Sequence, residues 1–132
     1  MDAGPLVAWL CPKDAHHRWA LTMLRPLQVE IVTCEAVLTE ACHMVAKDGV
    51  DPARVLEIVK RGAVVLARLS GDIRAIRGLM AQYRDQHMDF ADACVVRLAE
   101  MHEGATVCTT DGDFKVYRIH GRREIPLLAP WN

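Results

Sequence analysis

The sequence predicts an α/β fold with three layers, α/β/α, and a mainly parallel central sheet, contained in a single domain of residues 1–132. Helical patterns alternate along the chain with short apolar runs, as is typical of α/β domains. At 132 residues, 52% of them apolar, the chain is long enough for one compact core and too short for a second domain. Clustered acids follow one of the apolar runs, where open α/β sheets place their ligand sites.

The chain begins with a helix signal. Gly4 and Pro5 lead into a short apolar helix, because Pro fits the first turn of a helix. Asp2 stands directly before this turn, and only Met1 precedes it. If Asp2 ends a strand, that strand is either very short or begins upstream of the recorded start.

The next elements are a helix, a strand and a buried helix. Asp14 can cap a helix that ends before Pro26. A β-branched run over residues 27–32 predicts a strand. Thr33 is then expected to cap a helix over about 34–46, whose apolar side chains lie on more than one face and indicate burial.

The remaining elements alternate in the same way. Helices are expected to begin after short polar turns, and strands to coincide with short apolar runs. The expected helices cover about 51–61 and 70–84, and strands are expected over 105–110, 116–119 and 125–128, with 63–66 either a brief strand or the approach to a helix.

The acids that organise the chain lie between residues 88 and 114. Asp89 and Asp92 stand three apart, so both carboxylates leave one face of the first turn of a helix. Asp111 follows the apolar run 105–110, where a parallel strand ends. Gathered carboxylates repel by roughly 4 kcal/mol near a protein surface, so such a cluster usually holds a cation. Oxygen ligands favour a hard ion, Mg²⁺ or Mn²⁺.

Glu40 is a further candidate for this site. It lies in the middle of an apolar helix, and no Lys or Arg stands three or four positions away. A buried carboxylate without a partner is costly, so the fold must bring it one, and a metal ion is a candidate.

Composition excludes several other classes of protein. The net charge is −1, and it becomes +3 when the four candidate metal acids are set aside, which is compatible with a polyanionic substrate. Five cysteines without a CxxC pair indicate reduced thiols, and six histidines without ligand spacing argue against zinc catalysis. No signal peptide or long apolar run is present, so we expect a soluble, cytoplasmic protein with no membrane association.

Six short motifs, in order along the chain, give it a resemblance to a known family. It resembles a PIN domain, and most closely the VapC-like toxin ribonucleases of toxin–antitoxin pairs. Each motif alone is weak, whereas the ordered set is fairly specific. The motifs lie at residues 2–8, 16–20, 37–41, 88–93, 97–100 and 109–114.

The resemblance implies a Mg²⁺-dependent endoribonuclease that hydrolyses RNA to 5′-phosphate and 3′-hydroxyl products, with Mn²⁺ as a possible substitute. It also implies an antitoxin protein as partner and a homodimer. The implied metal ligands and catalytic acids are Asp2, Glu40, Asp92 and Asp111, with Asp89 and Asp113 as auxiliary metal ligands and Thr110 as a supporting hydroxyl. Arginines that could contact RNA phosphates are Arg74, Arg77, Arg118, Arg122 and Arg123.

Other interpretations remain open. Asp89 is equally well placed as a helix N-cap, and Asp113 could cap a turn. Arg74 and Arg77 could simply belong to a solvated helix face. The chain could be an inert PIN-fold module that binds RNA or protein, or a housekeeping RNA-processing nuclease. A phosphoacceptor signalling domain is disfavoured, because no adjacent acid pair occurs early in the chain.

Overall fold

The structure is a computed structural model that describes all 132 residues. Its helices and strands alternate as the sequence predicts, and each of the six strands is two residues long. The helices are α1 Ala3–Leu10, α2 His17–Leu24, α3 Glu35–Lys47, α4 Ala53–Lys60, α5 Ile73–Gln82 and α6 Phe90–Met101, with 3₁₀ turns η1 Ser70–Asp72, η2 Arg84–Gln86 and η3 Gly112–Lys115. The strands are β1 Val32–Thr33, β2 Val65–Leu66, β3 Val107–Cys108, β4 Arg118–Ile119, β5 Arg123–Glu124 and β6 Leu127–Leu128.

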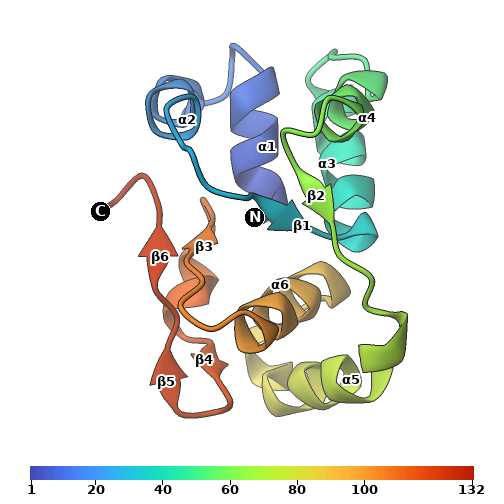
Figure 1. The fold of residues 1–132 in the computed structure, drawn as a ribbon, viewed down its shortest axis with the longest axis vertical. Helices are drawn as coiled ribbons and strands as arrows, with labels where there is room; N and C mark the ends of the chain where they lie inside the picture. Colours follow the sequence, from blue (N-terminus) through green and yellow to red (C-terminus); the bar gives the residue numbers. More distant parts are fainter.

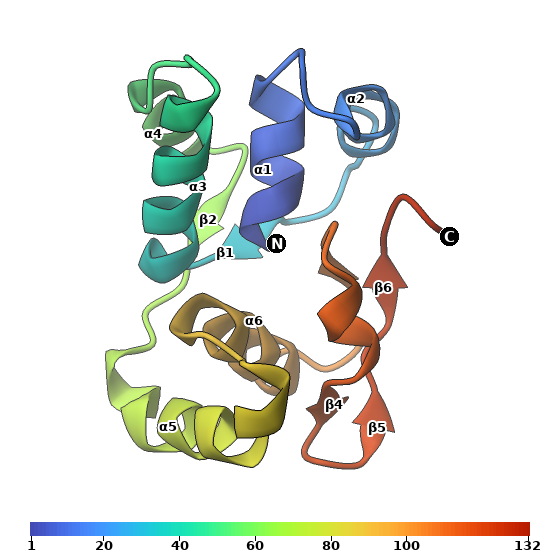
Figure 2. The same ribbon diagram turned by 180° about the vertical axis from the view of Figure 1, so that it is seen from behind.

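Two groups of helices lie on either side of β1 and β2. Figure 1 shows α1, α3 and α4 on one side of β1 and β2, and α6 with α5 on the other side. Seen from behind in Figure 2, the chain starts beside β1, between the two groups of helices. This arrangement agrees with the predicted α/β/α layers.

The sheet is mainly parallel but divided. β1 pairs with β2 and β3 pairs with β6, both in parallel, whereas β4 and β5 form an antiparallel hairpin. The strand expected over residues 27–32 is reduced to β1, because the main chain before Ile31 forms no ladder with β2. The parallel prediction is confirmed for two of the three strand pairs.

The starts of two helices differ from the prediction. Cys34, and not Thr33, is the N-cap residue of α3. Thr33 lies in β1, where its buried hydroxyl donates a hydrogen bond of 2.7 Å to the carbonyl of Met1. Asp72 makes no side-chain cap for α5 and instead pairs with Arg97 of α6 at 2.8 Å.

The first two residues lie between β1 and β3. The Met1 nitrogen donates to the Val32 carbonyl at 2.6 Å, and the Asp2 amide donates to the Cys108 carbonyl at 3.0 Å. Both residues are buried. The two residues before α1 are therefore hydrogen-bonded to β1 on one side and to β3 on the other.

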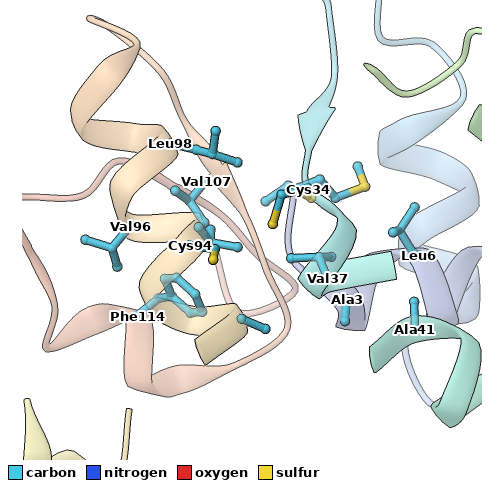
Figure 3. Packing of buried hydrophobic residues seen from close by; sticks show 14 of the residues in the cluster. Ala3, Leu6, Cys34, Val37, Ala41, Cys94, Val96, Leu98, Val107 and Phe114 are labelled. Carbon is cyan, nitrogen blue, oxygen red and sulfur yellow. The ribbon is translucent and has the colours of Figure 1, made fainter. Parts of the chain in front are cut away.

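One cluster of 34 buried residues forms the core. In Figure 3, Cys34 and Val37 from the start of α3 and Cys94 and Leu98 from α6 face this core from opposite sides. All five cysteines are free thiols, as predicted. No helix combines the length and the apolar character that a membrane crossing needs.

Gly4 lets the end of β3 approach α1 closely. A Cβ added at Gly4 would overlap the hydroxyl oxygen of Thr110 and would lie 3.2 Å from the Thr110 Cβ. The absence of a side chain at Gly4 thus brings the loop after β3 against the first turn of α1, next to Asp2.

We expect Gly4→Ala to lower the free energy of unfolding by about 1–3 kcal/mol through overpacking, although Ala is favoured over Gly in helices by about 1 kcal/mol. Adding Thr110→Ala should recover part of this loss, since it removes the hydroxyl but leaves the Cβ. Urea unfolding of both single variants and the double variant measures the coupling. Additive effects would show that Gly4 and Thr110 do not interact.

Candidate active site

The predicted acids sit at the beginnings of helical segments or inside α3. Asp2 is the N-cap of α1, Asp89 is the N-cap of α6, and Asp111 is the N-cap of η3. Asp92 lies in the first turn of α6, and Glu40 lies half-buried in α3. Helix N-termini stabilise negative charge, so the fold places these carboxylates where the helices partly offset their repulsion.

Thr109 connects two of the acids. Its buried hydroxyl donates to Asp2 Oδ2 at 2.7 Å and accepts from the Asp111 amide at 2.9 Å. The other carboxylate oxygen of Asp2 accepts from the Ala3 amide at 2.7 Å. One hydroxyl thus holds the carboxylate of Asp2 and the main chain of Asp111 together, across 107 positions of sequence.

Asp89 and Asp92 form a reciprocal capping pair. Asp89 Oδ1 accepts from the Asp92 amide at 2.8 Å, and Asp92 Oδ2 lies 3.4 Å from the Asp89 amide nitrogen. The fully buried Tyr117 donates its hydroxyl to Asp92 Oδ2 at 3.2 Å. Burial first, and then the charge of Asp92, raise the pKa of Tyr117 well above its usual range, so the hydroxyl remains a donor.

The acids act on each other electrostatically. Burial, followed by the charges of Asp89 and Asp2, raises the pKa of Asp92 from 3.8 to about 7. Burial, followed by the charges of Asp2, Asp89 and Asp111, raises the pKa of Glu40 from 4.5 to about 6. Burial also raises the pKa of Asp2, against the hydrogen bonds from Thr109 and Ala3. The acids from α1, α3, α6 and η3 therefore share one region of negative potential.

The carboxylates are not arranged as a finished ligand set. No three acidic, histidine or cysteine side chains converge in a way that would hold a metal ion. Asp2 and Asp92 instead turn oxygens toward donors of the protein, and Asp111 Oδ1 accepts from the Asp113 amide at 2.9 Å. The donor chemistry fits a hard divalent cation, whereas direct coordination requires some of these side chains to rotate.

The candidate RNA-contacting arginines fall into two groups. Arg118 is occupied, because it donates to the carbonyls of Lys115, Val116 and Tyr117 and lies 3.9 Å from Glu124. The four others are exposed and make no ion pair. They are Arg74 and Arg77 on α5, and Arg122 and Arg123 at the turn and strand that follow β4.

Comparison with protein families decides the assignment of the fold. The family model described as PIN domain matches residues 1–119, which is most of the chain. The chain belongs to the PIN domain family. None of the curated proteins compared with this PIN domain matches it. The PIN fold is a nuclease-type fold whose members typically use divalent metal ions, which agrees with the acidic site.

Thr109 and Tyr117 make hydrogen bonds to acids of this PIN domain, although neither is among the residues that the resemblance implies. We expected Thr110 to be the supporting hydroxyl, but Thr109 makes the hydrogen bonds to Asp2 and Asp111, and Thr110 packs against Gly4. The sequence does carry a signal for Thr109. It stands two residues after the buried Val107, so strand alternation places both side chains on the same face. Nothing in the sequence marks Tyr117 as a partner of Asp92.

Replacing Thr109 by Val should lower the free energy of unfolding by about 1–3 kcal/mol, since it leaves a buried Asp2 oxygen and the Asp111 amide without their partner. Thr22→Val, on the exposed face of α2, is the matched control and should change the stability by less than about 0.5 kcal/mol. Urea unfolding in EDTA measures both. Equal effects of the two substitutions would contradict the bridging role of Thr109.

The raised pKa of Asp92 predicts a pH-dependent stability without divalent ions. A carboxyl with a raised folded-state pKa stabilises the fold below its unfolded value and loses that contribution as the pH rises to the folded value. For Asp92 this window runs from pH 3.8 to about 7. In EDTA, Asp92→Asn should therefore match the parent protein near the bottom of this window and exceed its stability at pH 8.

The rise of the Asp92 pKa from 3.8 to about 7 corresponds to about 4 kcal/mol of folding free energy. Because Asp92 is partly exposed, solvent screening reduces the expected gain in stability of the Asn variant to about 1–2 kcal/mol. Urea unfolding at several pH values measures it. Mg²⁺ at pH 8 should abolish the advantage of the Asn variant by stabilising the parent protein. A pH-independent difference between the two proteins would show that Asp92 does not titrate as described.

Proposed function

We propose that this PIN domain is a Mg²⁺-dependent endoribonuclease that acts as the toxin of a toxin–antitoxin pair, in the cytoplasm. The proposal rests on the negative electrostatic potential that Asp2, Glu40, Asp92 and Asp111 share. Their carboxyls come from four separate elements, and two of them have pKa values raised to about 6 and about 7, partly by their neighbours' charge. A divalent cation would relieve this repulsion.

The four acids would hold the ion, and Asp89 and Asp113 are proposed as auxiliaries through water. A bound Mg²⁺ would activate the attacking water and offset charge on the scissile phosphate. Thr109 keeps Asp2 oriented, and the Tyr117 hydroxyl limits the rotation of Asp92. Because Asp89 already caps α6, it holds the first turn that carries Asp92 whether or not it touches a metal.

RNA would approach over exposed arginines. Arg74, Arg77 and Arg122 are proposed to contact phosphates, since they are exposed and free of ion pairs. Arg74 and Arg77 are on α5, which packs directly on the α6 helix that carries Asp89 and Asp92.

The partners of the proposed toxin would use apolar surface near the site. A groove of about 430 Å³ lies beside the first turn of α6 and includes the exposed side chains of Ile73 and Phe90. Phe90 follows Asp89 directly. An apolar antitoxin segment seated there would stand next to the acids, and homodimer formation would cover other exposed apolar residues such as Leu56 and Val65.

A second candidate function is an inert PIN-fold module that binds RNA or protein. The observation that favours it is the lack of three converged ligand side chains. A housekeeping RNA-processing nuclease would share the chemistry of the first candidate and differ in its target.

Structured RNA incubated with the protein and Mg²⁺ should be cleaved internally, leaving 5′-phosphate and 3′-hydroxyl ends. EDTA should abolish cleavage, Mn²⁺ should restore it, and Asp92→Asn should reduce the rate by at least about 100-fold, since several kcal/mol of charge stabilisation depend on the ligand set. Gel analysis with end-specific labelling measures these rates.

The outcomes separate the candidates. Binding of RNA without cleavage in Mg²⁺ or Mn²⁺ identifies the inert module, and cleavage that persists in EDTA or in the Asn variant removes the metal mechanism. Expression of the protein in growing cells distinguishes a toxin, which arrests growth through Asp92, from a processing enzyme, which does not.

A further inference from the structure

The groove beside the first turn of α6 contains two cysteines that come from different helical segments. Cys34 is the N-cap residue of α3, and Cys94 lies on α6 one turn after Phe90. Both cysteines line this groove, and the other three cysteines of the chain do not. Figure 3 shows Cys34 and Cys94 between the two helices. We call these two residues the thiol pair.

The sulfur atoms of the thiol pair are neighbours. The Cys94 thiol donates a hydrogen bond to the sulfur of Cys34, and α3 packs directly against α6. A disulfide needs two side chains that point toward each other from adjacent segments of main chain. The thiol pair meets this requirement, although its two members lie far apart in the sequence.

Cys34 is placed to be the nucleophile of the pair. The thiolate, and not the thiol, reacts with oxidants. The interaction with the Cys94 thiol, and then the main-chain N–H groups of Val37 and Ala36, hold the pKa of Cys34 below its usual range, against the opposing effect of burial. These N–H groups belong to the first turn of α3, which has no side-chain cap, so they can stabilise negative charge on the sulfur.

The burial of the thiol pair selects the chemistry of the oxidant. Cys34 is 3% exposed and Cys94 is 1% exposed, so the groove is their route to solvent. The sulfur of a bulky disulfide could not come within bonding distance of either thiol at this exposure. Hydrogen peroxide is close to water in size and can enter a groove of about 430 Å³.

We propose that a small peroxide entering this groove converts the thiol pair into a reversible disulfide. The bond would join the start of α3, the helix that carries Glu40, to α6, the helix that carries Asp92. It would therefore limit how far these two helices and their acids can separate. This inference does not depend on nuclease activity of the protein.

The reaction has two steps. The Cys34 thiolate attacks one oxygen of hydrogen peroxide, the O–O bond breaks, and the released hydroxide takes up a proton to form water, which leaves a sulfenic acid on Cys34. The sulfur of Cys94 then attacks the sulfur of Cys34, the S–O bond breaks, and the hydroxyl group leaves as water with the Cys94 proton. The two cysteines lose two electrons and two protons in total, and one peroxide is reduced to two waters. Disulfides that form transiently in reducing compartments are commonly redox-sensing.

Peptide mapping of the full chain after treatment with hydrogen peroxide tests the proposal. The folded protein should lose the mass of two hydrogen atoms, with one cross-link between the peptides that contain Cys34 and Cys94. Dithiothreitol should restore the original mass. Because the cross-link closes a long loop of chain, the urea midpoint of the oxidised protein should rise by roughly 1 M or more.

Three variants assign the roles of the two thiols. Cys94→Ser keeps a hydroxyl donor beside Cys34 but cannot form the disulfide, so a sulfenic acid should accumulate on Cys34 and react with dimedone. Cys34→Ser should form neither the disulfide nor a sulfenic acid on Cys94. Cys42→Ser is the matched control, because Cys42 lies on α3 outside the groove, and it should form the disulfide to the same extent as the parent protein.

Several results would overturn the proposal. These are a folded protein that keeps both thiols in excess peroxide, a cross-link to another cysteine or between two chains, and a disulfide that forms only in urea. A urea midpoint that is unchanged by the cross-link would contradict the predicted constraint on the two helices. Circular dichroism checks that the variants are folded, and the mapping of the parent protein decides independently of them.

Discussion

The position of the Asp2 carboxylate depends on a small set of buried hydrogen bonds between distant parts of the chain. Met1 and Asp2 are held by the main chains of β1 and β3, and the Thr109 hydroxyl fixes the Asp2 side chain. Each donor lost from this set would leave a buried acceptor unpaired, which costs more than the bond itself contributes. Two residues are therefore enough to fix Asp2, because strands on both sides supply hydrogen-bond acceptors for their main-chain N–H groups.

Helix capping explains how the fold can hold several acids close together. Asp2, Asp89 and Asp111 each cap a helical segment, so each carboxylate has a structural role independent of any cation. Burial and the neighbouring charges nevertheless raise the pKa values of Glu40 to about 6 and of Asp92 to about 7, and burial raises the pKa of Asp2 as well. The energetic cost of gathering the acids therefore falls on Asp2, Glu40 and Asp92, and a cation beside them would lower it.

The sequence was sufficient for the fold class and for most of the order of the elements, because these follow from apolar periodicity and from turn residues. It was insufficient for features set by tertiary contacts. Thr109 and Thr110 are identical side chains in adjacent positions, and it is the tertiary contacts that place Thr109 between Asp2 and Asp111 and Thr110 against Gly4. Likewise, the run 27–32 has strand propensity, yet its main chain forms a ladder only where β2 lies beside it.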